Sequence, residues 1–206
     1  MKKLVTTPQS YDSNVARAQT LDASWYLDPA VYDREMERIF ARTWQVAARL
    51  DQLAKPGDYL ATEVAGEPIV LVRDQTNQLR AYYNVCPHRA GIVARGSGNR
   101  KALQCLYHGW TFDLNGCLLR TPGLEGTEGF DPAQFALQPI RVDTWGAYIF
   151  VNLDSGAAPL AQVWGDALTA TSGIDLNQWR MVERAEYLID CNWKVYLDNY
   201  SEGYHV

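Results

Sequence analysis

Apolar side chains near the N-terminus follow a helical period. They recur at spacings of three and four residues, at Met36, Ile39, Phe40 and Trp44. This spacing is typical of an amphipathic helix with one buried stripe. Asp28-Pro29 favours a helix start, because aspartate caps the first turn and proline fits within it. We therefore expect a helix from residue 28 to about residue 41, after a polar and non-periodic arm.

From residue 44 onward the pattern changes to short segments that are rich in β-branched and aromatic residues and separated by turns. The expected strands are residues 44–49, 58–64, 69–73, 79–85, 102–105, 111–114, 117–120, 140–144 and 148–152. Asn115-Gly116, between two of them, is a strong signal for a two-residue β-hairpin. The first 150 residues are therefore expected to be mainly antiparallel β.

The pattern changes again after residue 152. We expect a domain boundary at residues 154–158, a helix over 159–171 opened by proline, a strand over 181–190 and a helix over 193–204 that runs to the chain end. So few elements cannot bury a core of their own. The sequence therefore predicts an incomplete second domain and suggests a fragment of a longer protein.

Composition narrows the class of protein. The 206 residues include 24 acidic and 19 basic side chains, a net charge of −5 that argues against nucleic acid as a partner. A hydrophobic share of 47% indicates a compact globular chain, and no apolar run approaches the roughly 20 residues of a membrane span. The N-terminus lacks the apolar core of a signal peptide, so we expect a cytoplasmic protein that does not bind membranes. In that compartment, cysteines are more often ligands or buried thiols than disulfides.

Two of the three histidines closely follow a cysteine, in Cys86-Pro87-His88 and Cys105-Leu106-Tyr107-His108. Isolated buried thiols and core histidines would be the simplest interpretation, but random placement rarely gives both spacings. Two thiolates and two imidazoles can hold a structural zinc or an iron–sulfur cluster. Zinc fingers usually pair Cys with Cys and His with His along the chain, whereas a two-iron cluster accepts mixed pairs, with both cysteines on one iron.

Two segments resemble the cluster-binding loops of Rieske proteins: Cys86-Pro87-His88-Arg89-Ala90-Gly91 and Cys105-Leu106-Tyr107-His108-Gly109-Trp110. Respiratory and photosynthetic Rieske proteins carry one more cysteine in each loop, where this chain has Gly91 and Tyr107. The flanking residues instead resemble the large (α) subunit of Rieske non-heme iron oxygenases, the aromatic-ring-hydroxylating and choline-carnitine monooxygenase group. Leu106 departs from the family pattern, in which proline is more usual.

The resemblance implies a mainly β fold. An antiparallel β Rieske domain over residues 35–155 would follow an N-terminal arm and helix start over residues 1–34. Residues 156–206 would begin an α+β helix-grip catalytic domain. It also implies a [2Fe-2S] cluster bound by Cys86, His88, Cys105 and His108. Cys117 and Cys191 have no histidine at ligand spacing, and we assign them no chemistry.

The end of the chain is rich in metal-ligating side chains. On a continuous helix Asp198, Glu202 and His205 share one face, which is either a solvated polar face or part of a metal site. By the resemblance, His205 is the first ligand of a mononuclear non-heme Fe(II). Glu202 is the carboxylate that bridges a cluster histidine of one subunit to an iron histidine of the next, and Asp198 supports the iron ligands. The other iron ligands of the family pattern would follow Val206.

The resemblance further implies the terminal oxygenase α subunit of a multicomponent system, a mono- or dioxygenase that uses O2 and NAD(P)H-derived electrons. A ferredoxin or flavin reductase would donate electrons, and a homotrimer or α3β3 assembly would act on a small organic substrate, either an aromatic ring or a quaternary amine. The 206 residues alone are expected to be inactive. Two alternatives remain, a Rieske-type ferredoxin without oxygenase activity and a zinc-stapled β binding module.

Overall fold

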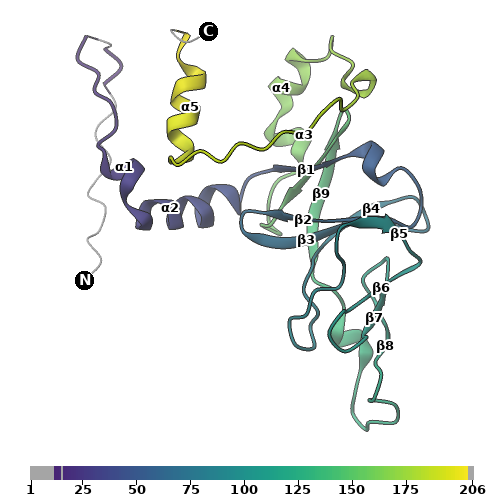
Figure 1. Cartoon of the computed structure of the whole chain (residues 1–206). Coiled ribbons are helices and arrows are strands. Elements are labelled where there is room, and N and C mark those ends of the chain that lie inside the picture. The colour runs from purple at the N-terminus through teal and green to yellow at the C-terminus, as the bar shows by residue number, and fades with distance from the viewer. Residues whose placement is uncertain (1–11, 15, 204–206) are drawn as a thin grey trace. The chain divides into compact units, whose positions relative to one another are not determined.

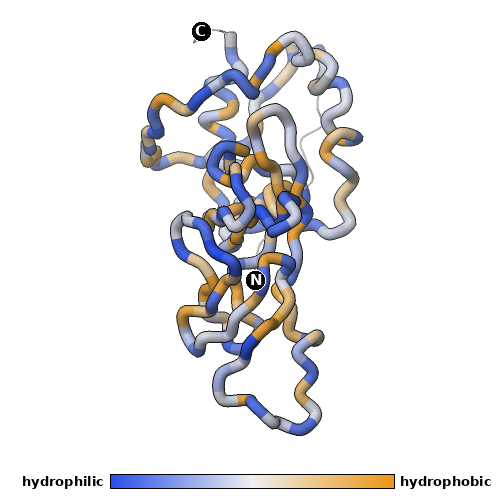
Figure 2. Tube along the Cα trace, turned by 90° about the vertical axis from the view of Figure 1, so that its right-hand side faces the viewer, coloured by the Kyte–Doolittle hydropathy of each residue, from blue (hydrophilic) through white to orange (hydrophobic). Residues whose placement is uncertain are grey.

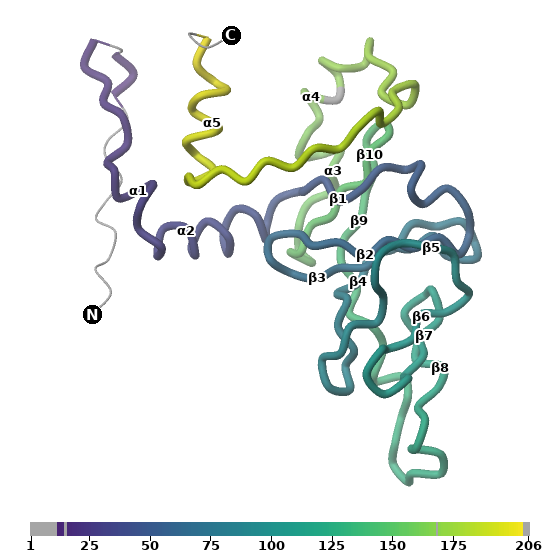
Figure 3. The backbone as a smooth tube through the Cα atoms, viewed as in Figure 1, coloured from purple at the N-terminus to yellow at the C-terminus, as the bar shows by residue number. Residues whose placement is uncertain are grey.

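The computed structural model describes residues 12–14 and 16–203. The chain forms two compact units (Figure 3). One comprises residues 39–180, and the other comprises the segments before residue 39 and after residue 180. The domain boundary expected at residues 154–158 stays a prediction.

The larger unit is built on a seven-stranded antiparallel sheet with the strand order β1-β10-β9-β4-β3-β2-β5 (Figure 1). Its strands are β1 (Gln45–Arg49), β2 (Asp58–Val64), β3 (Glu67–Arg73), β4 (Leu79–Tyr83), β5 (Ser97–Asn99), β9 (Pro139–Trp145) and β10 (Tyr148–Asn152). Strands β2, β3 and β4 form the expected meander. This mainly β, antiparallel architecture confirms the fold class expected from the sequence.

Strand β3 is buried on both faces of the sheet. Ile69 and Leu71 pack into one apolar core, and Val70 and Val72 pack into another. All four side chains are fully buried. Because successive side chains of a strand point to opposite faces, this run joins two cores across a single sheet. Apolar and polar residues alternate at short intervals along the trace (Figure 2).

A second, three-stranded sheet carries part of the candidate site. It consists of β6 (Ala102–Gln104), β7 (Thr111–Asp113) and β8 (Leu118–Arg120). Its buried Leu103 and Phe112 join the core that contains Val70 and Val72. The expected β7–β8 hairpin is confirmed, and Gly116 takes the positive φ of +85° that its turn requires.

The N-terminal helix begins where the sequence predicts. Helix α2 (Pro29–Glu35) continues as a π-helical turn over Met36–Phe40, after the short helix α1 (Ser24–Leu27). The Asp28 carboxylate caps α2 by accepting a hydrogen bond from the Ala30 N–H. The predicted buried stripe is partly wrong: Val31 and Glu35 are buried, whereas Ile39 is 41% exposed. The π-helical turn changes the helical period, which places Ile39 off the buried face.

The helix expected over residues 159–171 is divided into α3 (Leu160–Val163) and α4 (Gly165–Ala170). The break falls at Trp164, whose ring packs against Trp145 and Phe150 at centroid distances of 5.4 and 5.1 Å. Gly165 follows immediately, and glycine has a low helix propensity. Short 3₁₀ turns complete the unit at Leu50–Leu53, Pro132–Phe135 and Leu176–Gln178.

Two expectations for the C-terminal segment are wrong. Residues 181–190 form no strand, because within the described residues no other strand pairs with them, and Leu188 and Val182 are strongly exposed. Helix α5 (Trp193–Ser201) ends before Glu202, which has extended backbone angles at the C-cap. The Glu202 N–H still bonds to the Asp198 carbonyl, so the backbone leaves the helix only after Glu202. Residue 204 lies outside the described residues.

Within the described part of the chain, no helix is both long enough and apolar enough to cross a bilayer. All four cysteines are free thiols, with Cys86 and Cys105 buried and Cys117 and Cys191 exposed.

Candidate metal centre

The four predicted ligands lie on two loops of the larger unit. One loop follows β4 and the other connects β6 to β7 (Figure 1). Both thiols are buried in the core shared by the two sheets, Cys86 at 1% and Cys105 at 3% exposure. The structure therefore brings together residues that are separated by a strand and a turn in the sequence.

The two loops share one backbone hydrogen-bond pattern. In each, the cysteine N–H donates to the carbonyl five residues later, at Gly91 and Trp110, over 2.8 Å in both cases. In each, the cysteine carbonyl accepts from the N–H four residues later, at Ala90 and Gly109. These two residues also share a positive φ, +54° and +74°. The loops are thus local copies of one turn, joined by the Leu106 N–H donating to the Ile92 carbonyl over 3.0 Å.

Asn84 fixes the ends of the first loop. Its side chain is buried and donates to the Ala94 carbonyl over 2.9 Å. Its Oδ1 accepts from the Val93 and Ala94 N–H groups over 3.1 and 3.0 Å. The loop between Asn84 and Ala94 is therefore closed by one side chain rather than by strand pairing.

The two thiols are direct neighbours. Burial raises the pKa of Cys86 to about 11, and the hydrogen-bonded thiol of Cys105 adds to this shift. A positive metal would reverse this effect, because coordination stabilises the thiolate. Gly91 allows the loops to approach, since a Cβ there would lie 3.0 Å from the Cys105 Sγ and 2.9 Å from the Tyr107 Cβ.

The two imidazoles are also neighbours. The rings of His88 and His108 lie 4.8 Å apart, and His88 stacks on the buried Trp110 at 4.6 Å with an interplanar angle of 4°. Burial, together with His108 and Arg89, lowers the pKa of His88, which favours the neutral form that binds metals. The His88 Nδ1 is buried without a hydrogen-bond partner among the described residues. Such a nitrogen is suited to metal coordination.

The arrangement separates the donors by type. Cysteine lies beside cysteine and histidine beside histidine. A single zinc needs four ligands around one point and does not require like donors to lie in pairs. A two-iron cluster needs only two protein ligands at each iron, both thiolates on one and both imidazoles on the other. The donor set fits a [2Fe-2S] cluster better than zinc.

The residues predicted for the mononuclear iron belong to the other compact unit or lie outside the described residues. Asp198, on α5, accepts a hydrogen bond from the Tyr26 hydroxyl over 2.7 Å. Glu202 caps α5 with its N–H bonded to the Asp198 carbonyl. His205 lies outside the described residues, so its predicted role stays a prediction.

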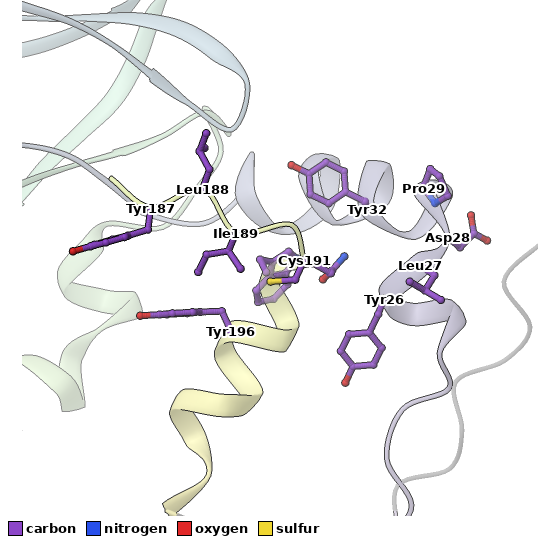
Figure 4. Close-up of a pocket in the computed structure, with 12 residues that line it drawn as sticks. Tyr26, Leu27, Asp28, Pro29, Tyr32, Tyr187, Leu188, Ile189, Cys191 and Tyr196 are labelled. Carbon is purple, nitrogen blue, oxygen red and sulfur yellow. The ribbon is translucent and has the colours of Figure 1, made fainter. Parts of the chain in front are cut away.

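The smaller unit also contains a cavity of about 640 Å³ (Figure 4). It is lined mainly by aromatic and apolar side chains from α1, α2, the segment before α5 and α5 itself: Tyr26, Leu27, Asp28, Pro29, Tyr32, Tyr187, Leu188, Ile189, Cys191, Asn192, Trp193 and Tyr196. Tyr187 and Tyr196 lie on one side, and Asp28 and Pro29 on the other. None of the predicted metal-binding residues lines it.

Sequence reasoning missed two features of these sites. Asn84 closes the first ligand loop, but it lay inside the strand predicted over residues 79–85, and the observed β4 ends at Tyr83. The buried pair of Glu35 and Lys194 links α2 to α5, and it joins residues that are 159 positions apart. Neither contact has a local pattern, since each depends on the tertiary fold.

Comparison with known families agrees with this geometry. Residues 43–132 match the Rieske [2Fe-2S] domain. Residues 176–206 match the catalytic domain of the ring-hydroxylating alpha subunit. The chain therefore carries the domain that binds a Rieske cluster.

The chain is also similar to individual proteins of one family. It is 34% identical to choline monooxygenase from Arabidopsis thaliana, over 100% of this chain and 51% of that protein. The structure of a quaternary ammonium Rieske monooxygenase in complex with L-carnitine matches with a TM-score of 0.84 and 35% identity, covering 91% of this chain and 54% of that one. The structure of naphthalene 1,2-dioxygenase from Rhodococcus sp. matches with a TM-score of 0.79 and 28% identity, covering 90% of this chain and 44% of that one.

These matches identify the chain as a member of the Rieske non-heme iron oxygenase α-subunit family. It spans about half the length of the curated relatives that it matches.

Proposed function

We propose that this chain is the cluster-bearing part of a terminal oxygenase α subunit. Cys86 and Cys105 would bind one iron of a [2Fe-2S] cluster, and His88 and His108 would bind the other. The observation that carries this proposal is the pairing of like donors, with thiol beside thiol and the two imidazole rings 4.8 Å apart. The buried, unpartnered Nδ1 of His88 supports it.

When bound, the cluster supplies a one-electron carrier whose potential is raised because two of its ligands are neutral imidazoles. The chain's own residues would set its surroundings. Trp110 covers one face of His88 and fixes the orientation of that ring. The loop carbonyls and N–H groups hold the cysteines in place before the cluster assembles.

We propose that the whole protein hydroxylates a small organic substrate with O2, at a mononuclear non-heme Fe(II). His205 would be its first ligand, Asp198 would support it, and Glu202 would bridge it to a cluster histidine. The match of residues 176–206 to the catalytic domain supports this assignment. A facial triad uses two histidines and a carboxylate, and the 206 residues contain one histidine besides His88 and His108. These residues alone should therefore bind no mononuclear iron and hydroxylate nothing.

For the substrate, we propose a quaternary ammonium compound rather than an aromatic ring. The support is the higher identity to the quaternary ammonium monooxygenase, 35%, than to naphthalene dioxygenase, 28%. A ferredoxin or flavin reductase would supply electrons to a homotrimer or an α3β3 assembly. The free thiols of all four cysteines are compatible with a reducing, cytoplasmic location.

The test is metal analysis combined with electron paramagnetic resonance of the reduced chain. We expect equal amounts of iron and acid-labile sulfide and the spectrum of a mixed-ligand cluster. Cys86→Ser or Cys105→Ser should abolish the iron and the sulfide. Cys117→Ser and Cys191→Ser should leave them unchanged, because these two thiols are exposed and have no histidine at ligand spacing in the sequence. Stoichiometric zinc without sulfide would overturn the proposal, and so would a cluster that depends on Cys117.

A further inference from the structure

Helix α5 is held by a buried acidic side chain from the N-terminal helices. Glu35 and Lys194 are each only 8% exposed. The Lys194 Nζ donates to both carboxylate oxygens of Glu35, over 2.7 and 2.9 Å. The Trp193 Nε1 donates to the same carboxylate over 2.8 Å. One carboxylate at the end of α2 thus binds two consecutive residues in the first turn of α5.

These contacts constrain the rotation of α5 as well as its position. Consecutive residues of a helix are about 100° apart around the axis, so a group that binds both allows little rotation. The Tyr26 hydroxyl adds a third contact at Asp198, one turn further along the face of Lys194. The Tyr26 ring also lies 5.7 Å from the Lys194 Nζ. Together Glu35 and Tyr26 hold α5 at two levels along its length.

The far end of α5 carries the carboxylates of the proposed iron site. Asp198 lies in the last two turns, and its carbonyl accepts the N–H of Glu202 at the C-cap. A rotation or shift at the first turn would therefore displace Asp198 and Glu202 together. The hydrogen bonds of Glu35 are made to α5 itself, so its effect would reach those carboxylates through the helix.

We propose that Glu35 and Tyr26 are positioning residues that orient α5, and with it Asp198 and Glu202, for electron transfer between the two metal centres. The electron-transfer part of this inference rests on the proposed function. The orientation of α5 does not, and it is tested separately.

The first experiment measures amide hydrogen exchange across α5 and at the Trp193 indole N–H in the 206-residue chain. Glu35→Gln leaves the Lys194 ammonium without a counter-charge. Exchange of the α5 amides and of the Trp193 indole N–H should therefore become roughly tenfold faster. Glu37→Gln is the matched control, since it removes the same charge from an exposed site two residues away. Unchanged exchange in Glu35→Gln would overturn the proposal.

Tyr26→Phe is the second variant, because it removes one hydroxyl and is compatible with folding. It should speed exchange chiefly around Asp198 and at the Glu202 N–H, whereas Tyr32→Phe on α2 should not. A double variant provides a rescue: Glu35→Gln with Lys194→Met leaves no buried charge and keeps an acceptor for Trp193. It should recover most of the protection lost in Glu35→Gln. Failure of this rescue would show that the ion pair does not orient α5.

The second experiment uses the complete subunit loaded with both metals. Glu35→Gln should slow transfer from the reduced cluster about tenfold while the resonance spectrum of the cluster stays unchanged. If Glu35 only stabilised the fold, Glu35→Gln would lower stability without slowing transfer from a cluster whose resonance spectrum is unchanged. An unchanged transfer rate would overturn the electron-transfer part of the inference. If the wild-type subunit itself showed no transfer, the proposed function would fail, while the exchange data would still decide whether Glu35 orients α5.

Discussion

At the scale of single residues, buried polar side chains in this chain close loops that strand pairing leaves open. Asp74 is 1% exposed and sits at the turn between β3 and β4. Its carboxylate accepts from the Thr76 hydroxyl and N–H, the Gln78 N–H and the Arg80 Nε, all between 2.7 and 2.8 Å. Asn84 closes the first ligand loop in the same manner. Each of these turns therefore depends on one side chain.

The stability of the chain should depend on pH through Asp74. Burial opposes its ionisation, but the hydrogen bonds from Gln78, Arg80 and Thr76 outweigh burial and lower its pKa from 3.8 to about 2. A carboxyl group whose pKa is lower in the folded chain than in the unfolded chain stabilises the fold at pH values above its unfolded-state pKa. This stabilisation is lost as the pH falls through its folded-state pKa. We expect Asp74→Asn to lower the free energy of unfolding by about 2 kcal/mol at pH 6 and by much less near pH 2.

Urea unfolding at a series of pH values checks this prediction. Asp166→Asn, at an exposed position of α4, serves as the control and should change stability little at any pH. A difference between wild type and Asp74→Asn that stays constant from pH 6 to pH 2 would contradict the assigned role.

At the scale of elements, local pattern predicted the strands that pair with their sequence neighbours. The meander from β2 to β4 and the β7–β8 hairpin both follow from alternation and turn residues. Strand β5 was not predicted, because Ser97, Gly98 and Asn99 carry no apolar signal. It forms by pairing with β2, where the Asn99 side chain also donates to the Asp58 carboxylate over 2.8 Å.

Residues 181–190 show the opposite case. Their composition favours a strand, but a strand needs hydrogen bonds from a neighbour, and none of the described strands supplies them. The end of α5 was also misjudged, because the side-chain pattern continues past Ser201 while the backbone turns at Glu202. Periodicity reports which side chains share a face, and it does not report where the backbone stops.

The close approach of the two ligand loops makes Gly91 a sensitive position. A Cβ at residue 91 would overlap the Tyr107 Cβ at 2.9 Å and press on the Cys105 Sγ at 3.0 Å. We expect Gly91→Ala to separate the loops, to lower the iron and sulfide content and to cost about 1–3 kcal/mol of stability, as overpacking does. Gly165→Ala is the matched control, because no atom lies within 4 Å of its added Cβ. Full cluster content and unchanged stability in Gly91→Ala would show that the loops tolerate the added methyl.

At the scale of the whole molecule, the sequence predicted the ligand set but not the contacts that support it. Cys86, His88, Cys105 and His108 were predicted as ligands because their spacing is local and chemically specific, and this assignment stays a prediction. The stack of His88 on Trp110 and the anchoring of Lys194 by Glu35 arise from tertiary packing. The chemistry of the site could therefore be predicted from the sequence, whereas the positioning of its groups required the structure.

The proposed link between the metal centres leads to a prediction for Glu202 in the complete subunit. An anionic carboxylate can accept hydrogen bonds from two imidazole N–H groups, whereas an amide offers one acceptor atom. Glu202→Gln keeps the size and shape of the side chain but loses the charge. Both metals should therefore remain bound while transfer between them slows by about 10- to 100-fold.

Single-turnover kinetics on the pre-reduced subunit measures this effect, with cluster reoxidation and product formation followed together. Glu183→Gln, at an exposed position in the segment before α5, is the charge-matched control and should transfer at the wild-type rate. Glu202 is the C-cap of α5, with its N–H bonded to the Asp198 carbonyl, so the helix positions it together with Asp198. If Glu202→Gln transferred as fast as wild type with both metals bound, Glu202 would not be the bridge, and the path between the centres would have to run through another residue.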